Sequence, residues 1–250
     1  MEAESDGRLA EILAMTKTYV AKVRKETGSK QTVSREVADR LEALASRATA
    51  EAKTVHSATE GPGSLDTVKD LTELREIVAG CTLCKLHETR TQTVFGSGSS
   101  SAKLVFVGEA PGAKEDEQGK PFVGAAGKLL TKIIEAIDLK REDVYICNVL
   151  KCRPPGNRDP LIHEKELCEP YLIRQLELIK PKVICSLGNH ATQTLLRTKD
   201  GIMGLRGKFH EYQGIPLMPT LHPAACLYTP SNKRYVWEDM KMVRDKYNES

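Results

Sequence analysis

Apolar and polar positions follow two different periods along most of the chain. Short apolar runs typical of buried strands occur at residues 103–107, 143–150, 182–186 and 215–218. Stretches with the spacing of an amphipathic helix lie between and after them, at residues 125–137, 163–179, from 189 onward and at 234–247. Strands that alternate with helices favour a parallel sheet covered on both faces. The pattern therefore predicts an α/β fold, a three-layer α/β/α sandwich around a central, mostly parallel sheet of four strands.

The first 70 residues have a different character. Helical spacing occurs from Leu9 to Tyr19 and from Ser34 to Ala45, and Gly61-Pro62-Gly63-Ser64 has the composition of a linker. This part is charged and alanine-rich, with few large apolar side chains. It predicts a helical or partly disordered extension over residues 1–70, followed by the α/β domain over residues 71–250. A helix pair that binds an unidentified partner is the alternative for the extension.

Charge and hydropathy narrow the class of protein only a little. The 37 basic and 34 acidic residues give a net charge of +3, which neither requires nor excludes nucleic acid because a local basic surface decides that. The sequence has no apolar run of about 18 residues, so no membrane span is expected. The first residues, MEAESDGR, are unlike a secretory signal. We therefore expect a cytoplasmic protein in a reducing compartment.

Seven cysteines in a reducing compartment predict metal ligands more than disulfides. Four of them have a spacing that suits a tetrahedral thiolate site: Cys81, Cys84, Cys152 and Cys168. Such a set fits either zinc or a [4Fe–4S] cluster, and both would be structural. Cys147 and Cys185 lie in apolar runs and are expected to be buried and inert. The role of Cys226 is ambiguous.

Glycine-, proline- and polar-rich stretches follow the predicted strands in a fixed order. They are Gly108-Glu109-Ala110-Pro111-Gly112 with Glu115-Asp116, then 119–124 (GKPFVG), 148–155 (NVLKCRPP) and 221–224 (LHPA). Binding sites of open α/β sheets lie beyond the carboxyl ends of the strands, so we expect these stretches to meet at one site.

In this order, and with the cysteines interleaved, the stretches resemble the family-four uracil-DNA glycosylases, the thermostable iron–sulfur branch of that superfamily. The resemblance covers about residues 75–249. It implies a DNA-repair hydrolase that flips uracil out of DNA, cuts its N-glycosidic bond and leaves an abasic site. It also favours a structural [4Fe–4S] cluster over zinc, and a monomer whose partner is uracil-containing DNA, single- or double-stranded.

The resemblance gives three residues a role at the flipped base. Phe122 matches the stacking position, and Asn148 matches the residue that reads uracil O4 and N3–H, because an amide offers one donor and one acceptor. His222 matches a histidine near O2 that stabilises the departing uracil anion while neutral. The residue types alone also fit plainer roles: a core phenylalanine, a polar strand end and a loop histidine.

Two glutamates match the family less completely. Glu109 matches its active-site glutamate, and Glu115 matches a position that crowds the C5 methyl and so excludes thymine. Better-known uracil glycosylases have an aspartate where this chain has Ala110, so the general base for the attacking water is unassigned. The backbone N–H of Ala110 is expected to help bind the anion.

Contacts with the DNA backbone are expected from three places. Lys151, Arg153 and Arg158 surround a rigid Pro-Pro-Gly turn suited to phosphates. Ser186 precedes a helix whose first N–H groups favour a phosphate. Leu227 lies in the segment that enters the gap left by the flipped base in relatives.

Three other functions compete with this one. A relative that traps uracil-DNA covalently carries a basic insert ending in histidine after the asparagine strand; here Gly156-Asn157-Arg158 follows at once and His163 is the only histidine nearby. A non-catalytic nucleic-acid-binding module with structural zinc would not need the residues of the base pocket. A glycosylase with a wider range, such as hypoxanthine or xanthine, is the third; Asn148 favours uracil, and the sequence does not give the width of the pocket.

Overall fold

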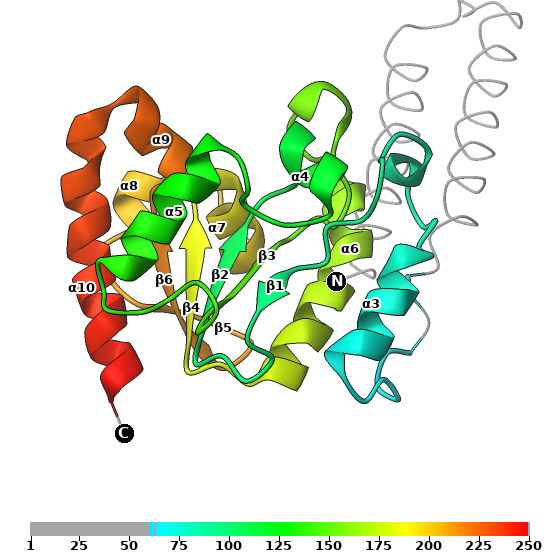
Figure 1. Cartoon of the computed structure of the whole chain (residues 1–250), viewed down its shortest axis with the longest axis horizontal. Helices are drawn as coiled ribbons and strands as arrows, with labels where there is room; N and C mark the ends of the chain where they lie inside the picture. Colours follow the sequence, from blue (N-terminus) through cyan, green and yellow to red (C-terminus); the bar gives the residue numbers. More distant parts are fainter. Residues whose placement is uncertain (1–60, 63, 250) are drawn as a thin grey trace, which may run out of the picture. The chain divides into compact units, whose positions relative to one another are not determined.

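One six-stranded sheet forms the centre of the computed structural model, which describes residues 61–62 and 64–249 (Figure 1). The strands are β1 (Ser97–Gly98), β2 (Leu104–Gly108), β3 (Tyr145–Asn148), β4 (Val183–Leu187), β5 (His210–Tyr212) and β6 (Ile215–Thr220). In space they follow the order β1-β3-β2-β4-β6-β5. The four inner strands are parallel, and β1 and β5 pair antiparallel at the two edges.

The prediction of four strands is wrong in number, although the α/β class and the three layers are confirmed. The predicted strands are the four parallel ones. The two missed strands span only two and three residues, too short to show an apolar period. Both lie at edges, where a strand needs fewer buried side chains.

Helices cover both faces of the sheet (Figure 1). On one face α5 (Ala125–Glu135), α9 (Pro223–Tyr228) and α10 (Lys233–Asn248) pack against the strands, and α6 (Ile162–Ile179) and α7 (Asn189–Leu196) cover the other. The shorter elements are α3 (Leu71–Ala79), α4 (Ala113–Gln118), α8 (Ile202–Leu205) and the 3-10 turns η1 (Lys85–Glu88), η2 (Pro155–Asn157) and η3 (Pro230–Asn232). None of the helices in residues 64–249 has the length and apolarity needed to span a bilayer.

The central strands read as unbroken apolar runs because both of their faces are buried. In β2, Leu104 and Phe106 point into the core under α5 and α10, and Val105 and Val107 point into the core under α6. Alternate side chains of one strand therefore hold the three layers together.

Residues just before the predicted domain start at residue 71 also pack against the domain. Leu65 and Val68 already contact the cluster formed by α3 and Tyr171 of α6. Asp70 then caps α3, because its carboxylate accepts the N–H groups of the second and third helical residues at 2.8 and 2.9 Å. The helices predicted for residues 9–19 and 34–45 lie outside the described residues.

Candidate active site

A cavity of about 470 Å³ opens at the carboxyl ends of β2, β3 and β6. Its size is typical of sites that hold a small ligand or one base. The predicted residues that line it together are Glu109, Ala110, Glu115, Phe122, Asn148, Arg158 and His222. The strand-end stretches identified from the sequence therefore meet at one place.

Asn148 forms the floor of this cavity. It ends β3 directly opposite Gly108 in the parallel ladder, and it is 2% exposed. Its Oδ1 is buried with no hydrogen-bond partner. A buried acceptor left unpaired costs about 1–3 kcal/mol, so this oxygen is suited to a donor that arrives with a ligand.

Gly108 is required by the side chains beside it. A Cβ at this position would lie 2.4 Å from Asn148 Oδ1 and 2.7 Å from Cζ of Phe122. The Asn148 amide and the Phe122 ring therefore occupy the space that a side chain at residue 108 would need.

Phe122 is held in a strained backbone conformation on the wall of the cavity. Its φ of 53° lies in the left-handed region, which is unfavourable for a bulky residue. A Cβ on Gly127 would come within 1.8 Å of the Phe122 carbonyl oxygen, so the loop depends on a glycine in α5. The ring is 5.6 Å from the His222 ring, between centroids, with planes tilted by 32°.

Glu115 fixes the loop that carries Phe122. Its Oε1 accepts the backbone N–H groups of Val123 and Gly124 at 2.9 and 3.0 Å. Hydrogen bonds to a carboxylate are roughly twice as strong as neutral ones. The carboxylate thus positions the aromatic wall and lines the cavity itself.

His222 follows β6 and caps α9. Its Nδ1 accepts the backbone N–H of Ala224 at 3.2 Å, which leaves the ring proton on Nε2. Burial lowers the pKa of His222 to about 4, although the charge of Glu115 acts in the opposite direction. The ring is therefore neutral at physiological pH and presents one N–H donor.

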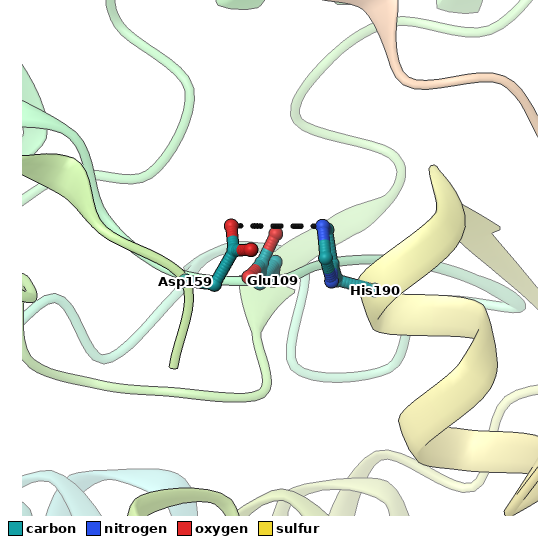
Figure 2. Close-up of side chains that lie close together, drawn as sticks. All are labelled: Glu109, Asp159 and His190. Atoms are coloured by element: carbon teal, nitrogen blue, oxygen red, sulfur yellow. Dashed lines mark ion pairs between the residues drawn. The ribbon is translucent and has the colours of Figure 1, made fainter. Parts of the chain in front are cut away.

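Glu109 follows β2 at the mouth of the cavity, next to two residues that were not identified from the sequence. Asp159 lies after η2 and His190 lies near the start of α7, so the three groups come from the segments that follow three different strands (Figure 2). One oxygen of each carboxylate and one ring nitrogen lie within 4.8 Å of one another, and His190 Nε2 is 3.6 Å from Asp159 Oδ1. Their position after β3 and β4 is the same signal that identified the other site residues.

Burial raises the pKa of the Glu109 carboxyl. His190 lowers this pKa, Asp159 raises it and Lys165 lowers it. A carboxyl with a raised pKa is a better base than a solvated one.

The four predicted ligand cysteines surround a second cavity, between the segment after α3, the loop after β3 and α6. It is lined by Cys81, Cys84, Cys152 and Cys168. Two sulfur atoms also accept hydrogen bonds: Cys152 from Arg90 Nη1 at 3.1 Å and Cys168 from the backbone N–H of Lys151 at 3.3 Å. The other cysteines, Cys147, Cys185 and Cys226, are buried elsewhere, and Cys226 lies in α9 and not in a loop.

The expected DNA contact of Lys151, next to the Pro-Pro-Gly turn, is wrong, because its side chain is buried. It is 1% exposed, and its Nζ donates to the Asn148 carbonyl oxygen at 2.7 Å and to Gln175 Oε1 at 2.5 Å. Burial lowers the pKa of this ammonium group, and nearby cysteines act in the opposite direction.

Ser186 and Arg158 are two further expected DNA contacts. The Ser186 side chain is fully buried and shares a hydrogen bond of 2.8 Å with Thr192, so its hydroxyl is not available to a phosphate. Arg158 lines the cavity but forms a two-pronged ion pair with the buried carboxylate of Glu164, at 2.6 and 2.9 Å. Its charge is therefore already compensated within the protein.

The remaining two predicted contacts are accessible. Arg153 is partly exposed and donates to Asn157. Leu227 is 46% exposed on α9, beside the still more exposed Tyr228. Arg153 directly precedes Pro154, and Leu227 lies in α9 with Ala224; both Pro154 and Ala224 line the first cavity.

An α/β sandwich whose strand ends carry an unpaired amide, an aromatic wall and a neutral histidine defines a base-binding enzyme. Residues 95–241 match the family model of the uracil DNA glycosylase superfamily. The chain is 46% identical to the type-4 uracil-DNA glycosylase of Sulfurisphaera tokodaii over 70% of its own length and 84% of the relative's. It is 48% identical to that of Archaeoglobus fulgidus, over 68% and 89%.

A type-5 uracil-DNA glycosylase of Pyrobaculum aerophilum is more distant, at 28% identity over 51% of this chain and 63% of the relative. The chain belongs to the uracil-DNA glycosylase superfamily and, within it, to the type-4 family.

Proposed function

We propose that this chain is a uracil-DNA glycosylase, which hydrolyses the N-glycosidic bond of a uracil flipped out of DNA. The observation that carries the proposal is the buried, unpaired Oδ1 of Asn148 on the floor of the cavity. Base-modifying enzymes extrude their target because its reactive atoms are inaccessible in a duplex. The type-4 relatives support the same assignment by their names.

Asn148 reads the edge of uracil. Its Oδ1 accepts the N3–H of the base, and its Nδ2 donates to O4. Cytosine presents an acceptor at N3 and a donor at N4, so the same amide orientation leaves buried groups unpaired. A site built to hydrogen-bond one pattern rejects the other strongly.

His222 and Phe122 promote departure of the base. Phe122 stacks on the uracil ring, which keeps its edge against Asn148. As the N1–C1′ bond breaks, its electron pair moves onto the base, and the Nε2–H of neutral His222 stabilises the charge at O2. The backbone N–H of Ala110, at the same cavity, adds a second donor.

The two glutamates have separate tasks. Glu109 orients the water that attacks C1′ and stabilises the cationic sugar. Glu115 holds the Phe122 loop through Val123 and Gly124, and its carboxylate occupies the space that the C5 methyl of thymine would need.

Cys81, Cys84, Cys152 and Cys168, which line the second cavity, would hold a structural [4Fe–4S] cluster. Four thiolates that line one cavity suit such a cluster as well as they suit zinc, and the resemblance to the iron–sulfur branch favours the cluster. The group would tie the segment after α3 to α6 and takes no part in base removal.

DNA is held by Arg153 at the Pro-Pro-Gly turn and by Leu227, which enters the gap left by the flipped base. The guanidinium of Arg153 binds a phosphate of the DNA backbone near the first cavity, whereas the guanidinium of Arg158 is paired with Glu164.

Single-turnover cleavage of labelled oligonucleotides tests the proposal. Oligonucleotides that carry one uracil, one cytosine or one thymine at the same position are incubated with excess protein, and alkali reveals abasic sites. We expect a strand break at uracil alone. Tight binding without a break refutes turnover, and an adduct that survives denaturation would identify a trapping protein.

A further inference from the structure

The cluster of Glu109, Asp159 and His190 contains two groups that the mechanism above does not use (Figure 2). Asp159 lines the base cavity together with Glu109. His190 is the second residue of α7. The cluster therefore connects the mouth of the cavity to the protein surface.

Its geometry suits a single water molecule. The three polar atoms lie within 4.8 Å of one another. The centre of a triangle with sides of this length is about 2.8 Å from each of its corners, which is a hydrogen-bond distance. A water at or just above the plane of this triangle has three polar partners, the usual number for an ordered water.

The charges in the cluster favour proton uptake from such a water. Glu109 is partly buried, and burial raises the pKa of its carboxyl. The turn after it continues Ala110-Pro111-Gly112 and supplies no other carboxylate. Besides Asp159 and His190, the charged group that acts on Glu109 is Lys165 of α6.

We propose that Asp159 and His190 form a proton outlet for Glu109, an inference that rests on the proposed glycosylase function. As C1′–N1 breaks, its electron pair leaves with uracil and the water oxygen bonds to C1′. As the C1′–O bond forms, the proton released from that water passes through Glu109 to the His190 imidazole within the same step. Asp159, 3.6 Å from Nε2, stabilises the imidazolium, and the uracil anion takes its own proton from solvent.

Exposure rises in the direction of this transfer. Glu109 is partly buried, whereas the side chains of His190 and Asp159 are 42% and 77% exposed. Arg158 Nη1 donates to the backbone carbonyl of Asp159 at 3.0 Å, which fixes the loop without neutralising the carboxylate. His190 can thus return the proton to bulk water between turnovers, and it acts as a positioning residue through Glu109.

Chemical rescue is the sharpest test. His190→Ala should lower the single-turnover rate on uracil-DNA by about 100-fold, the lower range of general-base effects, with little change in DNA affinity. Because His190 is exposed, added imidazole should restore part of the rate in proportion to its basic form. Asp159→Asn should reduce the rate less and move the acidic limb of the pH–rate profile to lower pH.

His163→Ala, a variant of an exposed histidine on α6, provides the matched control and should cleave normally. The inference is overturned if His190→Ala keeps its rate, or loses it without imidazole rescue and without a change in pH profile. Loss of wild-type activity on chelation, with recovery on adding a divalent cation, would also overturn it in favour of a metal site. Failure of wild-type protein to cleave uracil-DNA would instead refute the proposed function.

Discussion

Gly108 and Asn148 show how closely single residues determine the base pocket. The two lie opposite each other in the β2–β3 ladder, and the amide oxygen occupies the space that a side chain on Gly108 would take. The atoms that such a side chain would displace are the ends of Asn148 and Phe122 and not the backbone of the sheet.

Gly108→Ala should therefore abolish uracil excision while the protein still folds. The added methyl group pushes Asn148 Oδ1 and the Phe122 ring out of position, so we expect at least a 100-fold loss of single-turnover rate, in line with misplacing a reacting group by about 1 Å. Gly201→Ala is the control, because nothing lies within 4 Å of a Cβ there. Normal activity of Gly108→Ala, with an unchanged melting temperature, would show that the pocket tolerates the shift.

The neutral state of His222 has a direct signature in pH dependence. Its pKa of about 4 in the folded protein lies below the ordinary value of 6.5. The unfolded chain therefore binds a proton more readily, and stability is lost as the pH falls from about 6.5 towards 4. Nitrogen NMR of the ring should report a neutral imidazole with its proton on Nε2 down to about pH 5. A ring that titrates between pH 6 and 7 would contradict this, and His222→Gln should remove this part of the pH dependence of stability.

Sequence reasoning brought Asn148, Phe122 and His222 to one cavity through the family resemblance, and Asn148 and His222 also through their places at or after a strand end. It failed for Ser186 and Lys151, since the end of a strand does not reveal whether a side chain points to solvent or into the layer beneath. Lysine is rarely fully buried, so no pattern in the sequence could indicate that Lys151 reaches back to the carbonyl of Asn148.

At the scale of elements, the loop between α4 and α5 is held by one carboxylate and one glycine. Glu115 binds two backbone N–H groups of the loop, and Gly127 lets the Phe122 carbonyl approach α5. These contacts offset a backbone strain of about 1–3 kcal/mol at Phe122.

Glu115→Ala and Glu115→Gln should therefore differ. Glutamine retains a side-chain oxygen that accepts the same N–H groups, whereas alanine leaves both unpaired at about 1–3 kcal/mol each. We expect the alanine variant to lose about 10- to 100-fold in uracil excision and the glutamine variant much less. Thymine-DNA serves as a second substrate, since gain of thymine cleavage in either variant measures how far Glu115 excludes the methyl group. Equal losses in the two variants would refute the positioning role of the carboxylate.

The edge strands mark the limit of prediction for elements. The four parallel strands can be recognised in the sequence as apolar runs, because both of their faces are buried. Strands β1 and β5 cannot be recognised in this way, because they are short and pair on one side only. Their antiparallel direction follows from connections that the apolar period does not encode.

For the whole molecule, the cysteine cavity joins parts that are far apart in sequence. Cys81 and Cys84 precede the sheet, Cys152 follows β3 and Cys168 lies in α6. A group bound there would hold the first described segment on the domain.

Cys152→Ser should lower both iron content and the melting temperature. Loss of a structural metal centre is among the largest single-site effects on stability, and for a chain of this size we expect a fall of about 10 °C or more. Cys226→Ser is the matched control, because Cys226 is buried but lies outside the second cavity. It should keep its full iron content. Full iron and an unchanged melting temperature in Cys152→Ser would remove this cysteine from the ligand set.

The short segment from Asn148 to Cys152 connects the two cavities, because Asn148 lines the first and residues 150–152 line the second. Asn148 reads the base, Cys152 faces the cysteine cavity, and Lys151 bonds to a sulfur on one side and to the Asn148 carbonyl on the other. A substitution in this segment that alters the backbone at one cavity therefore also alters the backbone at the other, so the two sites constrain each other in evolution. A group bound at the cysteines would therefore stiffen the strand end that carries Asn148, although it lies outside the base pocket.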